Sequence, residues 1–195
     1  MYHRTMKIRM EIITPQPKEL FFNNKNVCCI SDIHIGVHQN GSLWHKVTLE
    51  WVQWLDKQLK KKAIKDIIVC GDLFHYRDEI AVNTIHVVTQ FLNILKDYNI
   101  VMIVGNHDAY YKDRSDVNSL SILSGWSNIT VIPDVGETVA FGRKLGFCSW
   151  GVKDKDIPTA DILFGHFEVQ NFRYNFAKIC SHGTPVKRLL KKSPN

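Results

Sequence analysis

The sequence predicts an α/β fold in which a mainly parallel central β-sheet is flanked by helices. Short apolar runs alternate with longer amphipathic segments over residues 27–104. Such strand–helix–strand alternation favours right-handed crossovers between parallel strands. The chain has 195 residues, which is long enough for one domain with its own core.

The first half of the chain supplies three strands and two helices. Val27–Ser31, Ile67–Cys70 and Ile100–Val104 are short apolar runs, which is typical of buried strands. Between them, Leu43–Lys62 and Asn83–Asp97 carry apolar residues at helical spacing. The side of the first helix that should face the core contains Leu43, Val47, Trp51, Trp54 and Leu55, with Trp44 also expected to be buried. The matching stripe of the second contains Ile85, Val88, Leu92 and Leu95.

The second half of the chain predicts a series of shorter strands. Proline and glycine residues separate its apolar runs and mark the turns between them. Leu120–Leu123 is expected to form a helical turn, and Val186–Lys192 is expected to begin a basic helix. The predicted strands are Ile129–Ile132, Thr138–Phe141, Lys144–Trp150 and Asp161–Phe164.

The composition favours a globular protein of the cytoplasm. No apolar run approaches the roughly 20 residues that a membrane helix needs, and the N-terminus lacks the pattern of a secretory signal. Four of the five cysteines lie in apolar runs and none forms a CxxC pair, so they are expected to be buried thiols in a reducing compartment. The net charge of +6 suits a partner such as DNA, although solvated helix faces also explain the lysines at 57–65 and 187–192.

Four polar clusters directly follow four of the predicted strands. Loops beyond the carboxyl ends of parallel strands form the ligand crevice of an open α/β sheet, so clusters far apart in sequence are expected to converge. A single cluster of this kind is weak evidence, whereas the ordered set is specific. The clusters are DIH at 32–34, GDLFH at 71–75, GNHD at 105–108 and GHFE at 165–168.

The side chains in these clusters predict a centre for two divalent cations. Carboxylate, imidazole and amide groups together suit manganese, iron or zinc, and histidine makes magnesium less favoured. Two cations roughly 3.5–4 Å apart need one ligand that reaches both, which a carboxylate can do. Asp72 occupies the strand-to-loop junction beside Gly71, where such a bridging ligand is expected. Manganese is the first choice for the metal.

The ordered motifs DxH, GDxxH, GNHD and GHxE resemble those of the calcineurin-like metallophosphoesterases. The forms SDIHIG at 31–36, GDLFH and GNHD are most similar to the SbcD-like DNA-repair exonucleases of that superfamily, a branch that includes a phage recombination endonuclease subunit. The resemblance implies a metallophosphoesterase domain over residues 27–185. An extension or edge strand over residues 1–26 would precede it, and a basic tail over residues 186–195 would follow.

The resemblance also implies which residues bind the metals. Asp32 and His34 would bind the first cation, and Asp72 would bridge it to the second. Asn106 and His166 would complete the second site.

The same resemblance implies three catalytic residues and a partner. His107 would protonate or stabilise the leaving oxygen, Asp108 would orient the ring of His107, and His75 would lie near the phosphate. The sequence has no G-x4-G-K-[ST] motif, so it should not hydrolyse ATP itself. The expected partners are DNA and an SMC-like ATPase subunit.

The sequence departs from the superfamily pattern in one respect. Relatives close the site with a Gly-His-x-His motif on a later strand, and this sequence has none; His182 is its only later histidine. We therefore expect an incomplete catalytic domain with its last strands missing and a weaker metal site. An unpaired sheet edge would favour association, which makes a homodimer a further candidate assembly.

Three functions remain open at this point. The first is a metal-dependent DNA exonuclease or endonuclease subunit. The second is a phosphoesterase for small phosphate esters, cyclic nucleotides or phosphoproteins. The third is an inactive remnant or binding module.

Overall fold

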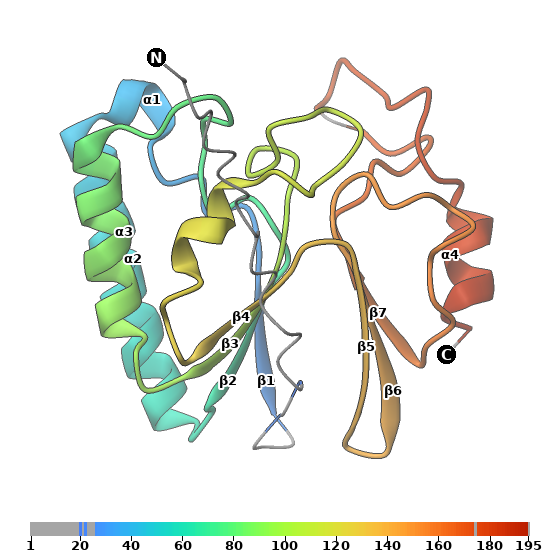
Figure 1. The fold of residues 1–195 in the computed structure, drawn as a ribbon, viewed down its shortest axis with the longest axis horizontal. Helices are drawn as coiled ribbons and strands as arrows, with labels where there is room; N and C mark the ends of the chain where they lie inside the picture. The colour runs from blue at the N-terminus through green and yellow to red at the C-terminus, as the bar shows by residue number, and fades with distance from the viewer. Residues whose placement is uncertain (1–19, 21, 23–25, 174, 195) are drawn as a thin grey trace, which may run out of the picture.

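The computed structural model describes residues 20, 22, 26–173 and 175–194. Figure 1 shows four layers in succession: a pair of helices, a four-stranded sheet, a three-stranded sheet and a short final helix. The predicted α/β fold with flanking helices is confirmed. Most of the predicted extension over residues 1–26 lies outside the described residues. Among the helices that can be described, none is both long and apolar enough to cross a membrane.

The first sheet is entirely parallel, with strand order β1-β2-β3-β4. It consists of β1 (Val27–Ile30), β2 (Asp66–Val69), β3 (Asn99–Ile103) and β4 (Ile129–Ile132). Helices cover one face and the second sheet covers the other (Figure 1). A strand covered on both faces needs apolar residues on both, which explains why β2 is buried along its whole length.

Two long helices form the layer on the outer face of this sheet. They are α2 (Ser42–Lys61) and α3 (Val82–Ile94). A short left-handed turn, α1 (Val37–Asn40), precedes α2. The helical turn predicted near residue 120 is a 3-10 helix, η1 (Ser119–Leu123).

The prediction of which side of α2 faces the core was right only in part. Leu55 is buried and Trp51 packs against the core, as expected. Leu43 is 68% exposed and Trp54 is 55% exposed, and Trp44, Val47 and, on α3, Ile85 are exposed as well. Val52, Leu55 and Leu59 recur at helical spacing and form the buried side. Because apolar residues occur on more than one side of α2, their spacing alone did not determine which side would face the sheet.

The second sheet is mixed and separate from the first. It consists of β5 (Val135–Ala140), β6 (Arg143–Cys148) and β7 (Ile162–Gly165). β6 pairs antiparallel with β5 and parallel with β7. Its inner face packs against the first sheet, where Leu145 and Phe147 join Ile68, Val101 and Ile103 in one apolar cluster.

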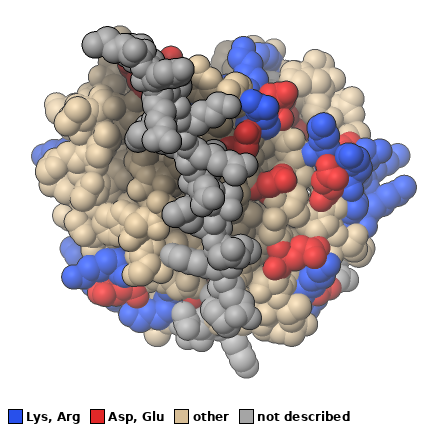
Figure 2. Space-filling view, viewed as in Figure 1, with Lys and Arg blue, Asp and Glu red and all other residues tan. Residues whose placement is uncertain are grey.

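The basic side chains lie mainly toward the edges of the face drawn in Figure 2. The lysines near the end of α2 are exposed, and so are Lys187, Arg188 and Lys191 of α4 (Val186–Lys192). Arg188 is paired with Asp154. This distribution agrees with solvated helix faces.

The prediction of buried thiols holds for only part of the cysteines. Cys148 and Cys180 are buried, but Cys29 is exposed and Cys28 and Cys70 are half-buried. The Sγ atoms of Cys29 and Cys70 lie 3.4 Å apart on neighbouring strands. The apolar runs therefore predicted the positions of these strands but not the burial of each side chain in them.

Replacing Tyr98 with phenylalanine should lower the free energy of unfolding by about 1–2 kcal/mol at neutral pH. Tyr98 is 2% exposed, and its hydroxyl donates a 2.7 Å hydrogen bond to Asp56 on α2. Burial alone would raise the pKa of Asp56, but hydrogen bonds from Lys60 and Tyr98 outweigh it and lower that pKa. Urea denaturation measures the effect, with exposed Tyr110→Phe as the control.

The same bond has a predicted pH dependence. The folded-state pKa of Asp56 is lowered. The ionised carboxylate therefore adds to the free energy of unfolding above the unfolded-state pKa, and this contribution is lost as pH falls through the folded-state pKa. The difference between wild type and Tyr98→Phe should therefore shrink in acid. An undiminished difference below the lowered pKa would show that the ionised carboxylate is not the partner that matters.

Candidate metal centre

The four polar clusters meet at the carboxyl edge of the first sheet. Three follow β1, β2 and β3, and the fourth follows β7 of the second sheet. Backbone bonds join the first two loops: Asp32 donates its N–H to the carbonyl of Gly71, and His34 donates to that of Asp72. The structure thus brings together loops that are separated by up to about one hundred and thirty residues of sequence.

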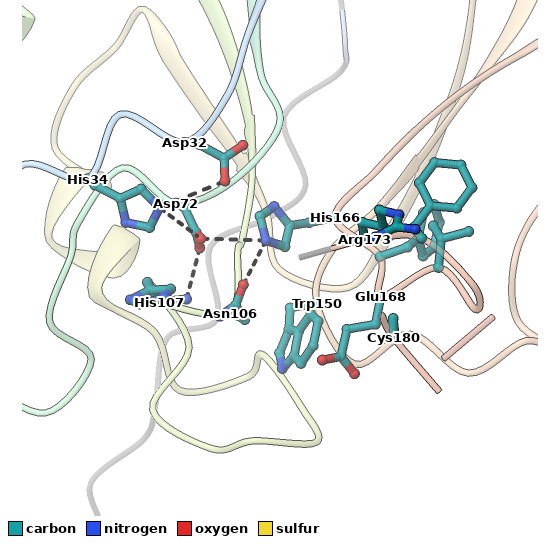
Figure 3. Close-up of a pocket in the computed structure, with 13 residues that line it drawn as sticks. Asp32, His34, Asp72, Asn106, His107, Trp150, His166, Glu168, Arg173 and Cys180 are labelled. Carbon is teal, nitrogen blue, oxygen red and sulfur yellow. Dashed lines mark hydrogen bonds and ion pairs between the residues drawn. The ribbon is translucent and has the colours of Figure 1, made fainter. Parts of the chain in front are cut away.

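The carboxylate of Asp72 lies at the centre of this group. Its Oδ2 is 3.5 Å from Nε2 of His34 and 3.6 Å from Nε2 of His166 (Figure 3). Its Oδ1 accepts a 2.8 Å hydrogen bond from the backbone N–H of His107. Asp32 lies at the exposed rim, with Oδ1 3.8 Å from Nε2 of His34. Asp72 is itself buried, so its charge needs a compensating cation nearby.

His166 directs Nε2 toward Asn106 and Asp72. Its Nδ1 lies 2.8 Å from the carbonyl oxygen of Cys70, and a carbonyl can only accept, so Nδ1 donates this hydrogen bond. Nε2 lies 2.8 Å from Oδ1 of Asn106 and 3.6 Å from Oδ2 of Asp72. When Nε2 carries no proton, these are three acceptor atoms facing one another, an arrangement that a cation would satisfy.

Three of these residues have unusual backbone conformations. Asp32, His34 and Asp72 have φ values of 56°, 50° and 57°, in the left-handed region that costs free energy for residues other than glycine. Gly105 permits this packing, because a Cβ there would lie 2.0 Å from Oδ1 of Asp72. Strain of this kind persists where a fixed side-chain position is required.

The residues present fit a pair of divalent cations. Donor atoms of Asp32, Asp72 and His166 all lie within 4.8 Å of one another, and those of the three neighbouring histidines, His34, His75 and His107, do the same. Tetrahedral ligands about 2.1 Å from a metal lie about 3.4 Å apart, close to the separations around Asp72. Burial lowers the pKa of His34, which keeps the ring in the neutral form that binds a metal.

Asp108 is bonded differently from the sequence expectation. Its side chain is fully buried, and its two oxygens accept hydrogen bonds from the backbone N–H groups of Asp72, Leu73, Phe74 and Gly105 at 2.8–3.3 Å. Burial raises the pKa of Asp108 to about 6, and the backbone bonds oppose that rise. Among the described residues, the carboxylate thus holds two loops together rather than contacting the ring of His107.

The ring of His107 is held by another group. Its Nδ1 lies 2.5 Å from the carbonyl oxygen of His75, and the two rings stack with their centroids 5.2 Å apart. Nδ1 of His75 is 3.3 Å from Nδ1 of His34. Burial, and next the neighbouring His34 and His107, lower the pKa of His75. His75 therefore lies in the cluster and its backbone carbonyl contacts the ring of His107, while its place near the phosphate stays a prediction.

A cavity of about 490 Å³ opens in front of these side chains. Its far wall comes from the segment after β7, including Glu168, Phe172 and Arg173 (Figure 3). Trp150, which follows β6, also lines it. No motif marks Trp150 in the sequence, because a tryptophan at the end of an apolar run resembles a core residue.

The family profile of the calcineurin-like phosphoesterases matches residues 25–190, and so covers most of the chain. The chain belongs to the calcineurin-like phosphoesterase family. Membership makes it a hydrolase, and it confirms the resemblance drawn from the motifs.

One curated relative and two solved structures are similar to this calcineurin-like phosphoesterase. The relative is "Exonuclease subunit 1" of Enterobacteria phage T4, 28% identical over 166 residues, which are 79% of this chain and 48% of the relative. The chain thus spans about half the length of that protein. A nuclease MPE of Pseudomonas putida is 24% identical, with TM-score 0.42, covering 63% of this chain and 52% of the other. AQ665 of Aquifex aeolicus, a protein of unknown function, is 16% identical, with TM-score 0.41, and the match covers 80% of this chain and 82% of AQ665.

His182 does not lie where it could supply the metal ligand expected from the missing Gly-His-x-His motif. Its side chain is 67% exposed, and its Nε2 lies 3.2 Å from a carboxylate oxygen of Glu168. It is not among the described residues that line the cavity. Its position therefore does not support a role as a metal ligand.

Proposed function

We propose that this chain is the catalytic part of a DNA nuclease subunit that hydrolyses phosphodiester bonds with two divalent cations. The observation that supports this most strongly is the position of the Asp72 carboxylate between the imidazoles of His34 and His166. One carboxylate facing two imidazoles is what a bridged pair of cations requires. The phage relative, named an exonuclease subunit, favours DNA as the substrate and a multi-subunit enzyme.

The proposed ligands lie around Asp72. Asp32 and His34 would hold the first cation together with Asp72, and Asn106 and His166 would hold the second. The mixture of carboxylate, imidazole and amide favours manganese, with iron, zinc and magnesium as alternatives.

The chain's own residues supply the proton in the proposed reaction. Bound cations would supply positive charge for the phosphodiester oxygens and would make an attacking water more acidic. Because Nδ1 of His107 donates its hydrogen bond to the carbonyl of His75, Nε2 is the nitrogen from which a proton can pass to substrate. A protonated His107 therefore transfers its Nε2 proton to the leaving oxygen. Asp108 keeps the loop that carries His107 in place.

The proposed partner is an SMC-like ATPase subunit, working with this chain in DNA repair or recombination in a bacterial or phage-infected cytoplasm. The relative's name marks it as one subunit of an enzyme. The sequence contains no P-loop motif, and the proposal assigns ATP hydrolysis to the partner subunit.

Cleavage of DNA compared with a generic ester tests the proposal. The purified chain would be incubated with Mn²⁺ and either single-stranded DNA, double-stranded DNA or 4-nitrophenyl phosphate. We expect DNA cleavage that a chelator abolishes and excess Mn²⁺ restores. Turnover of the aryl ester without any DNA cleavage would favour the small-ester phosphoesterase instead.

Replacing His107 with glutamine should leave two Mn²⁺ bound and lower turnover by about 10²- to 10⁴-fold, the usual contribution of general acid catalysis. Glutamine can still accept or donate a hydrogen bond but cannot titrate. Calorimetric titration measures the bound metal, and DNA cleavage measures turnover. His86→Gln, at an exposed position on α3, is the control. Cleavage at the wild-type rate by His107→Gln would remove His107 from the mechanism.

A further inference from the structure

We propose that Trp150 stacks on a base of single-stranded DNA beside the metal centre, and that the strand crosses Trp150 toward the loop of residues 110–117. This inference rests on the proposed nuclease function and names the form of DNA that the site accepts. It makes Trp150 a substrate-positioning residue.

The indole of Trp150 is held in a fixed orientation. Its backbone N–H donates to the carbonyl of Val104 at 2.8 Å, which joins the ends of β6 and β3. Its ring Nε1–H donates to the carbonyl of Lys112 at 2.9 Å. An indole has only this one donor, so what it can still offer a ligand is its aromatic surface. The ring centroid is 6.1 Å from that of His166, next to the proposed ligands.

Trp150 is partly buried against the core and lines two cavities. One is the cavity of the metal centre, about 490 Å³. The other is a cavity of about 430 Å³, lined by Arg114, Ser115, Asp116, Pro133, Asp134 and Gly151 together with Trp150. A ligand held at the metal centre that extends into the second cavity therefore passes the indole. A polymer with flat, regularly spaced rings suits that path.

The loop beyond Trp150 carries further aromatic and basic groups. Tyr110 is 53% exposed, and its ring meets that of Tyr111 edge to face at 5.0 Å. The guanidinium of Arg114 lies 4.0 Å from the ring centre of Tyr111. Aromatic rings beside a cation are the usual means of binding single strands.

The loop is anchored so that these groups keep their positions. Tyr110 donates its N–H to the carbonyl of Val117, and the hydroxyl of Ser115 donates to that of Pro133. A Cβ at Gly151 would lie 2.6 Å from the carbonyl oxygen of Asp113, so the loop sits directly on the backbone that follows Trp150.

The charge of the loop also favours stacking over simple attraction of phosphate. Lys112 and Arg114 are offset by Asp113 and Asp116, and Arg114 Nε lies 3.1 Å from the Asp116 carboxylate. A site that depends on stacking needs unpaired bases, because the faces of bases in a duplex are already covered. The path is therefore selective for single strands.

Binding of two matched single strands tests this inference without relying on turnover. One probe is a labelled oligothymidylate of twelve nucleotides, and the other is the same backbone with every base removed. Fluorescence anisotropy would measure their affinities for the chain carrying His107→Gln, with and without Trp150→Ala. We expect Trp150→Ala to weaken binding of the oligothymidylate about tenfold to a hundredfold and to leave binding of the abasic strand unchanged.

Two further variants separate stacking from structure. Trp150→Phe keeps an aromatic face but loses the bond to Lys112, so it should recover most of the selectivity for bases. Trp54→Ala, at an exposed position on α2, should change neither affinity.

Equal weakening of both strands by Trp150→Ala would assign Trp150 a structural role and overturn the inference. So would equal affinity of the parent chain for both strands, or an undisturbed affinity for oligothymidylate in Trp150→Ala. DNA cleavage by the wild-type chain is scored separately. A chain that binds with this selectivity but does not cut DNA would refute the proposed function and leave the base-stacking role in place.

Discussion

Replacing Asp72 with asparagine is expected to abolish binding of both Mn²⁺ ions and all DNA cleavage. The Oδ2 atom of Asp72 faces His34 and His166 at nearly equal distances, so the substitution removes one negative charge from both sites at once. Loss of partners that only support a ligand weakens metal binding by about 10- to 100-fold, and losing the shared ligand itself should cost more. Calorimetric titration with Mn²⁺ measures the result.

The asparagine variant should still fold. Its amide oxygen can replace Oδ1 as the acceptor for the backbone N–H of His107, so circular dichroism and thermal unfolding without metal should resemble those of wild type. Asp97→Asn, at an exposed position after α3, controls for the loss of a carboxylate. If Asp72→Asn still bound two Mn²⁺, the bridging role would be wrong.

Replacing Asp108 with alanine is expected to destabilise the chain by about 4 kcal/mol or more, because each orphaned buried donor costs about 1–3 kcal/mol. The side chain accepts bonds from four backbone N–H groups in two loops. Alanine leaves those donors buried without partners. Asp108→Asn keeps one acceptor oxygen, so its free energy of unfolding should lie between those of wild type and Asp108→Ala. Urea denaturation measures the free energy of unfolding of these three proteins.

The experiment on Asp108 also decides between two roles. The family resemblance implies that Asp108 orients His107, in which case its loss would lower turnover and leave stability nearly unchanged. The bonds in the structure imply the opposite order of effects. Asp156→Ala, at an exposed position, is the control. An Asp108→Ala chain as stable as that control would favour the orienting role.

The sequence predicted strands better than it predicted helix faces. The strands of the first sheet are short apolar runs bounded by glycine and polar residues, so their positions followed from local pattern. Three of the four loops converged because parallel strands end at one edge of a sheet, whereas the loop with His166 follows β7 of the second sheet. The buried side of α2 was predicted only in part, because Leu43 and Trp54 are apolar yet exposed, and the choice of side depends on what packs against the helix.

Other features depend on contacts that no local pattern records. The division into two sheets follows from pairing between β6 and β7, which is a long-range choice. Asp108 beside His107 suggested a side-chain pair, whereas its partners are backbone groups of other loops. Trp150 resembled a core residue because its exposure to two cavities depends on the loop that binds its Nε1.

The proposed ligands come from both sheets, with His166 alone carried by the second. A cation bound by both His166 and Asp72 would therefore link the second sheet to the first. Binding of the metal would then also stabilise the fold, since a ligand present at a hundred times its Kd adds about 2.7 kcal/mol to the free energy of unfolding. Removal of the metal would lower the stability of the domain as well as its activity.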